Sequence, residues 1–160
     1  MDYMNGKKMI LYGLLVLSWA SLLKLDKFTF KRYLPVGTFT ALIYTILSEV
    51  NANTKWWKVL ETIFPKLPSN FPFALGPFVA LPIWIFKLTF GRFWLYLLMN
   101  IVSGVLFAYP ITKLFDKLGI YTLKKMTRIQ LFFLSVISSI FIYVYQVFID
   151  DTLKKRPDQY

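Results

Sequence analysis

Charged residues divide this chain into five apolar runs. The runs cover about residues 9–24, 34–50, 71–88, 93–113 and 129–149. The last two have the length of about 20 residues that a helix needs to cross the roughly 30 Å hydrocarbon core of a bilayer. The first three are shorter, and basic side chains at their ends can reach the headgroups. The pattern predicts an all-α integral membrane bundle of about five transmembrane helices, in a single membrane domain over residues 1–160.

The first run also has features of a secretory signal peptide, because Lys7 and Lys8 precede its apolar stretch. No small-x-small cleavage site follows it, and Lys24 and Lys27 come directly after. We therefore expect a retained first helix. With five spans, ten Lys and Arg residues fall on one side of the membrane and nine on the other, so the positive-inside rule does not fix the orientation. Lys7 and Lys8 favour a cytoplasmic N-terminus.

The segment between the second and third runs has an amphipathic pattern over residues 55–64. At about 100° per residue, Trp56 and Trp57 fall on the apolar arc of a helix, whereas Lys55 and Lys58 fall on the polar arc. This pattern predicts an interfacial amphipathic helix, with its Trp rings at headgroup depth and its Lys side chains in water. Such a helix serves either as a connector on the membrane or as a lid or partner-binding surface.

The third run is rich in proline, which predicts a kinked or broken helix. Pro72, Pro77 and Pro82 recur every five residues, and Gly76 precedes Pro77. Each proline removes a backbone N–H donor and presses against the preceding turn. In transporters, breaks of this kind occur at binding sites, but proline is also frequent in ordinary membrane helices. Both interpretations stay open.

Among the polar residues in or at the ends of the runs, three are candidates for a functional contact. Glu49 ends the second run, where its carboxylate can either reach the interface or form a proton or cation site. Asn100 lies inside the fourth run, and Ser103 follows it on the same helix face. Polar groups at this depth usually bond across helices, close to small residues such as Gly104. We expect mainly packing contacts, and keep Glu49, Asn100 and Ser103 as candidate polar contacts for a ligand.

Composition supports the membrane assignment and limits the chemistry. Hydrophobic residues make up 57% of the chain, above the roughly 45–50% of ordinary soluble domains. The chain contains no His and no Cys, which excludes imidazole bases, thiolate nucleophiles, disulfides and His or Cys metal ligands. Its eight acidic residues form no spaced pair suited to binding a metal–diphosphate group. We predict no catalytic, cofactor-binding or metal-ligating residue, and no enzyme.

The net charge of +11 is spread over both ends of the predicted bundle. Because no long basic segment exists, a nucleic-acid partner is not expected. The lipid bilayer is the expected partner, together with a membrane protein or a second copy of the chain. The loop before the last run contains Gly119, which predicts the end of the preceding helix. This loop is a candidate site for anionic lipid. Its basic residues are Lys113, Lys117, Lys124, Lys125 and Arg128.

Several strings of residues resemble those of small uncharacterised multi-spanning membrane proteins of spore-forming Gram-positive bacteria. The resemblance implies a bacterial plasma membrane as the location and carries over no activity. The strings are KRYLPV at 31–36, KWWKV at 55–59, LGPF at 75–78, WIFKLTFGRFWLY at 84–96, FAYPITKLFDKLGIY at 107–121 and YVYQ at 143–146.

Three hypotheses about function follow from these observations. The first is a non-enzymatic accessory or assembly subunit of a membrane complex, because the loops are short and small residues offer helix-contact faces. The second is a small carrier or substrate-binding protein that uses the broken third span with Glu49 and Asn100, provided that both face one cavity. The third is a membrane enzyme acting on lipid with Glu49 or Asp116 as base, and it has the weakest support because neither carboxylate has a positioned partner.

Overall fold

The computed structural model describes residues 6–61, 63, 66 and 71–154. Most of these residues are helical. The helices are α1 (Gly6–Leu22), α2 (Lys27–Thr54), α3 (Phe71–Leu75), α4 (Pro77–Thr89), α5 (Phe93–Leu106), the π-helix η1 (Phe107–Ile111), α6 (Thr112–Lys117) and α7 (Arg128–Lys154). Two short strands, β1 (Trp57–Val59) and β2 (Tyr121–Leu123), pair antiparallel. The expected all-α bundle is confirmed, with this two-stranded ribbon added.

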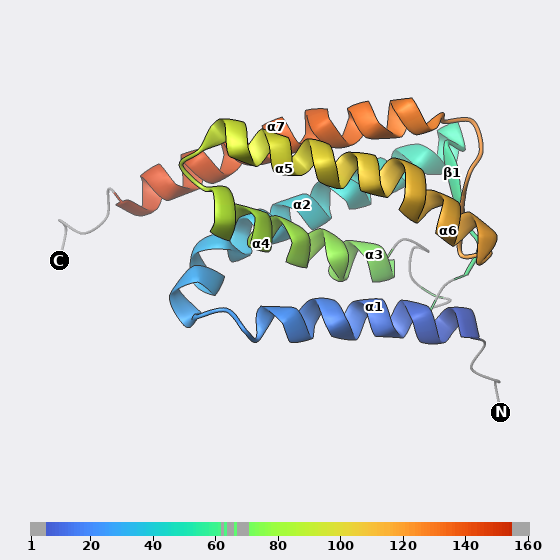
Figure 1. The fold of residues 1–160 in the computed structure, drawn as a ribbon, viewed down its shortest axis with the longest axis horizontal. Helices are drawn as coiled ribbons and strands as arrows, with labels where there is room; N and C mark the ends of the chain where they lie inside the picture. Colours follow the sequence, from blue (N-terminus) through green and yellow to red (C-terminus); the bar gives the residue numbers. More distant parts are fainter. Residues whose placement is uncertain (1–5, 62, 64–65, 67–70, 155–160) are drawn as a thin grey trace.

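The long helices lie side by side and alternate in direction (Figure 1). One end of the bundle, here called the strand end, contains the start of α1, the two strands and the end of α6 (Figure 1). The other end, here called the turn end, contains the α1–α2 and α4–α5 connections and the end of α7 (Figure 1). Helix α4 lies between α2 and α5 in the packing and also contacts α1.

Four helical segments are long and apolar enough to cross a membrane, among the residues that the structure describes. They are Lys27–Thr54, Phe71–Thr89, Phe93–Lys117 and Arg128–Thr152. The first predicted span is also a helix, but α1 has 17 residues, fewer than the roughly 20 of a typical span. Each of the five apolar runs therefore overlaps a helix, and the structure separates four full-length candidates from one shorter helix.

Glycine permits two sharp connections and one close helix contact. Gly91 has φ +86° in the turn between α4 and α5, and Gly119 has φ +66° after α6. The N–H of Gly119 donates to Asp116 O, which ends α6 where the sequence indicates a helix stop. A Cβ added at Gly37 would lie 3.0 Å from Val79 O, so glycine allows α2 to approach α4 closely.

The helix expected over residues 55–64 is wrong. Residues 57–59 form β1 instead, with Trp57 opposite Leu123 and Val59 opposite Tyr121. Lys55 ends α2 with a left-handed φ of 54°, so the chain leaves the helix before the Trp pair. The side chain of Asn51 then accepts from the Trp57 N–H and donates to the Trp57 carbonyl, as a neighbouring strand would. Residues 62 and 64 of the predicted helix lie outside the described residues.

The third membrane segment is interrupted at Gly76, between α3 and α4. Pro77 is the first residue of α4, where a missing N–H is tolerated, whereas Pro82 lies inside α4 and Pro72 lies in the first turn of α3. The indole N–H of Trp19 on α1 donates to Leu75 O at 3.0 Å. A backbone carbonyl left at the break is thus bonded by a neighbouring helix, as a nonpolar environment requires.

Candidate functional site

An interhelical cavity lies between α2, α4, α5, η1 and α7. It has a volume of about 240 Å³ and contains two of the polar residues predicted from the sequence, Asn100 and Ser103. Pro82, inside α4, also lines it, so the cavity borders the proline-rich helix. The full lining is Thr40, Tyr44, Phe78, Leu81, Pro82, Ile85, Tyr96, Asn100, Ser103, Gly104, Leu106, Phe107, Ile111, Ser135, Ser139 and Ile142. None of these residues is charged.

The hydroxyl and amide groups of this lining donate mainly to backbone carbonyls. Tyr96 OH donates to Ser139 O at 2.8 Å, and Asn100 Nδ2 donates to Tyr96 O at 2.9 Å. Ser135 Oγ and Thr40 Oγ1 donate to carbonyls of their own helices. In these four groups the donated hydrogens are used, so this part of the lining offers oxygen lone pairs, together with the second N–H of Asn100. A bound molecule with an N–H or O–H donor would complement it.

The cavity opens on the apolar outer surface of the bundle. Three of its lining residues are exposed, namely Leu81 on α4, Leu106 on α5 and Ile111 on η1. Leu81 and Leu106 lie near the middle of the membrane-length segments Phe71–Thr89 and Phe93–Lys117. In a bilayer, this opening would face lipid tails, so a molecule already dissolved in the membrane could enter from the side.

A π-helical turn in the fourth segment shapes one wall of the cavity. Pro110 has no N–H to continue the α-helical ladder, and the chain widens to η1 over Phe107–Ile111. The N–H and the hydroxyl of Thr112 both donate to Phe107 O, the latter at 2.6 Å. Phe107 and Ile111 of this turn line the cavity. This turn was not predicted from the sequence, although Pro110 inside an apolar run indicates it.

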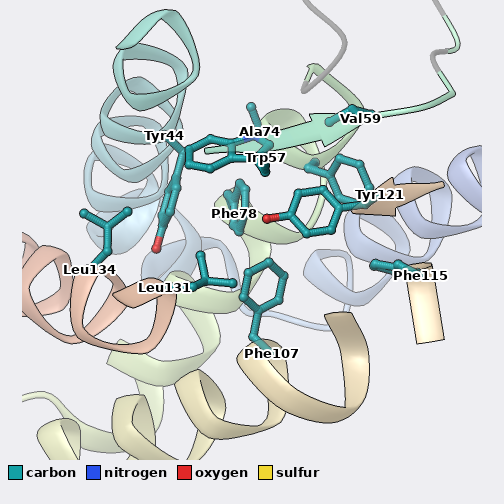
Figure 2. A pocket seen from close by; sticks show the side chains of 11 residues that line it. Tyr44, Trp57, Val59, Ala74, Phe78, Phe107, Phe115, Tyr121, Leu131 and Leu134 are labelled. Atoms are coloured by element: carbon teal, nitrogen blue, oxygen red, sulfur yellow. The ribbon is translucent and has the colours of Figure 1, made fainter. Parts of the chain in front are cut away.

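A second, smaller space, here called the aromatic cavity, adjoins the first. It has a volume of about 50 Å³, and Tyr44, Phe78 and Phe107 line both spaces. Figure 2 shows the aromatic rings converging from α2, α4, η1 and the two strands, with the Tyr121 hydroxyl pointing inward. Burial raises the pKa of the Tyr121 phenol above its ordinary value, so this group stays neutral. Its remaining lining residues are Trp57, Val59, Phe73, Ala74, Phe115, Tyr121, Leu131 and Leu134.

Glu49 does not face the interhelical cavity. It is exposed near the end of α2 and lines a surface depression of about 790 Å³ at the strand end. Glu49 and Asn100 therefore do not line the same cavity, whereas the carrier hypothesis required both to face one cavity. We call this depression the lysine groove, and its lining residues are Ser48, Glu49, Asn51, Ala52, Lys55, Trp57, Lys58, Val59, Lys124 and Lys125.

The predicted interfacial anchors occupy different environments. Lys55 and Lys58 are exposed, Trp56 is half-buried, and Trp57 is buried in the core at the strand end. Trp57 is therefore a core residue and not an anchor at the surface, because the strand turns its ring inward. Among the basic residues expected to bind anionic lipid, two line the lysine groove, Lys124 and Lys125. The other three are exposed and are not part of its lining: Lys113, Lys117 and Arg128.

An ion pair at the turn end was not predicted from the sequence. Arg32 Nη2 lies 2.7 Å from Asp150 Oδ1, and Asp150 is buried near the end of α7. Gln146, one turn earlier on α7, is fully buried; its Oε1 has no hydrogen-bond partner among the described residues. Asp150 follows the last apolar run and Arg32 precedes the second, so both stood at run ends, where charges usually reach water.

A comparison with known proteins finds no matching protein-family model, curated protein or solved structure. The function is therefore inferred from the chemistry of this chain itself. Its interhelical cavity is uncharged, largely apolar and open on an apolar surface. Such a space can bind an amphipathic molecule.

Proposed function

We propose that this chain is a non-enzymatic integral membrane protein of a bacterial plasma membrane that binds an amphipathic molecule in the interhelical cavity. Four apolar helices of membrane-spanning length support a location in a membrane. The observation that carries the binding role is the cavity of about 240 Å³ with Asn100 and Ser103 in its lining. The missing His and Cys residues in the sequence support a binding role over a catalytic one.

The lining indicates the chemistry of the ligand. Its oxygen lone pairs favour a hydroxyl, amine or amide donor, and its uncharged surroundings favour a neutral molecule. The apolar walls favour an aliphatic or aromatic body. Because typical ligand pockets hold about 300–1,000 Å³, a volume of about 240 Å³ suits a small molecule or one chain of a larger lipid.

Filling the cavity tests this proposal. In Ser103→Leu, a larger side chain would occupy the space that Ser103 lines, and we expect the bound molecule to be lost. Val102→Leu is the matched control, because Val102 is the adjacent, exposed residue on α5 and does not line the cavity. Each variant is purified in mild detergent, and small molecules in an organic extract are identified and quantified by mass spectrometry.

The expected result is a compound present in the wild type and Val102→Leu at about equal amounts and reduced at least tenfold in Ser103→Leu, corresponding to about 1.4 kcal/mol. Asn100→Leu should have the same effect, since it removes the amide. Equal retention in Ser103→Leu, with the same thermal stability as wild type, would contradict the proposal.

A second candidate function is an accessory or assembly subunit of a membrane complex. It is favoured by α1, which packs on α3 and α4 and leaves Val16 and Leu17 more than 60% exposed. A Cβ added at Gly13 would have no atom within 4 Å, so a second helix could approach α1 closely there. Gly13→Leu should then abolish co-purification of a partner chain without lowering stability. If wild type is recovered only as a monomer with no partner, this candidate is rejected.

A further inference from the structure

The lysine groove is assembled by the β-ribbon from two distant parts of the chain. Lys55 and Lys58 flank the start of β1, and Lys124 and Lys125 follow β2. The N–H of Lys124 donates to Trp56 O at 2.9 Å, and the N–H of Lys125 donates to Lys55 O at 3.4 Å. Backbone hydrogen bonds therefore bring the two lysine pairs together, so the groove is a product of the fold.

The groove has an excess of positive charge. Four lysines line it, and Glu49 is the only acidic residue among its lining. In the described part of the chain, no ion pair joins any of these lysines to a carboxylate. Like charges held close together repel, and a bound anion would relieve the repulsion. All four lysine side chains are exposed, so their ammonium groups can reach a ligand.

The position of the groove indicates where the anion comes from. It lies where α2 ends and α7 begins, and both helices are long and apolar enough to cross the membrane. The ends of such helices meet the phosphates of lipid headgroups, and basic pockets there are typical lipid sites. The adjacent Trp56 is half-buried, as is common for tryptophan at the membrane interface.

We propose that the lysine groove binds the phosphate of an anionic phospholipid headgroup through Lys55, Lys58, Lys124 and Lys125. This inference rests on the proposed membrane location but not on a ligand in the interhelical cavity. It also revises the lipid contact expected from sequence, because the site combines residues before and within β1 with the residues after β2 and leaves out Lys113, Lys117 and Arg128.

Lipid binding to detergent-solubilised protein tests the proposal, measured by native mass spectrometry. The probes are phosphatidylglycerol, phosphatidylcholine and inorganic phosphate. Lys58→Gln/Lys124→Gln removes one lysine from each pair and should weaken phosphatidylglycerol binding at least tenfold. Lys113→Gln/Lys117→Gln removes the same charge from α6, outside the groove, and should change the affinity less than twofold. Glu49→Gln should strengthen binding severalfold, an effect opposite in sign that a folding defect would not produce.

Each outcome decides the proposal. Preference for phosphatidylglycerol over phosphatidylcholine, lost in the groove variant alone, supports it. Equal losses in the groove and α6 variants would show a diffuse positive surface and overturn it, as would tighter binding of free phosphate than of the lipid. Recovery of the protein from cells without detergent would reject the membrane location itself, and loss of the cavity compound in Ser103→Leu reports separately on the proposed function.

Discussion

Single side chains connect the start of α2 to the end of α7. Arg32 Nη2 and Nε both contact Asp150 Oδ1, at 2.7 and 2.8 Å. The Arg32 guanidinium also lies 5.0 Å from the centre of the Phe90 ring and 5.5 Å from that of Tyr33. These contacts place a charge pair and two rings at one corner of the turn end. The Asp150 side chain is only 8% exposed, and the contact with the Arg32 guanidinium offsets part of the cost of burying its carboxylate.

We predict that Asp150→Asn destabilises the fold by about 2 kcal/mol, because it leaves the Arg32 charge without its buried partner. The apparent Tm in detergent should fall by about 4–8 °C. The double variant Arg32→Met/Asp150→Leu should recover most of this loss, since replacing both partners by apolar groups avoids the cost of desolvation. A double variant no more stable than Asp150→Asn would contradict this explanation.

At the scale of the element, the break between α3 and α4 requires a small residue. A Cβ added at Gly76 would lie 2.8 Å from Pro72 O, a backbone atom that cannot move independently of α3. We predict that Gly76→Ala destabilises the protein by about 1–3 kcal/mol.

Gly13→Ala is the matched control for Gly76→Ala, because nothing lies within 4 Å of its added Cβ. That variant should be neutral or stabilising by up to about 1 kcal/mol, since alanine favours a helix. The measurement is thermal unfolding of both variants under the same conditions. Equal stability of the two variants would show that the contact with Pro72 is unimportant.

The start of α2 depends on an ionised cap. Asp26 Oδ2 accepts from the Thr29 N–H at 2.9 Å, and this hydrogen bond lowers the pKa of Asp26 below its ordinary value. A lowered pKa means that the cap stabilises the folded state above the unfolded pKa of about 3.9, and that this stabilisation is lost as the pH falls through the folded pKa.

We therefore predict that Asp26→Ala lowers Tm by a constant amount between about pH 7 and 5, and that the difference from wild type shrinks below about pH 4. Thermal unfolding over this pH series checks the prediction. Asp26→Asn should keep most of the cap and show little pH dependence, because its amide oxygen accepts without titrating. A difference for Asp26→Ala that grows toward low pH would contradict the assigned sign.

The β-ribbon formed by β1 and β2 could not be predicted from local sequence patterns. Trp57, Lys58 and Val59 alternate apolar and polar, which fits a strand, but their neighbours also fit one face of a helix. Residues 57–59 form a strand because the left-handed backbone at Lys55 ends α2 and because a partner strand more than 60 residues away pairs with them. By contrast, Gly91 and Gly119 could be assigned from sequence, because both act within a few residues of their own position.

At the scale of the whole molecule, the alternating helices place the connections at two ends. Lys24 and Arg92 lie in the connections at the turn end, and Lys124 follows β2 at the strand end (Figure 1). We predict that single cysteines introduced at Lys24 and Arg92 label from one side of the membrane, and one at Lys124 from the other. The absence of native cysteine makes the experiment direct. Labelling of Lys24 and Lys124 from the same side would show that the three membrane-length segments between them do not all cross.

The cavities are also formed only by the packing of helices across the whole molecule. Asn100 and Ser103 could be selected from sequence because polar residues are costly inside an apolar run. Their shared cavity depends on α2, α4 and α7, whose positions no local pattern specifies. The same packing leaves Glu49 outside the cavity and brings it together with four lysines in the lysine groove.

The sequence by itself determined the apolar segments, their ends and the absence of imidazole and thiol chemistry. These features follow from composition and from local backbone rules, which act over a few residues. Only the tertiary structure decided the pairing of β1 with β2, the Arg32–Asp150 contact and the cavity around Asn100. Each of these features joins residues far apart in the chain. Burial and hydrogen bonding stabilise such contacts only once the helices have packed together.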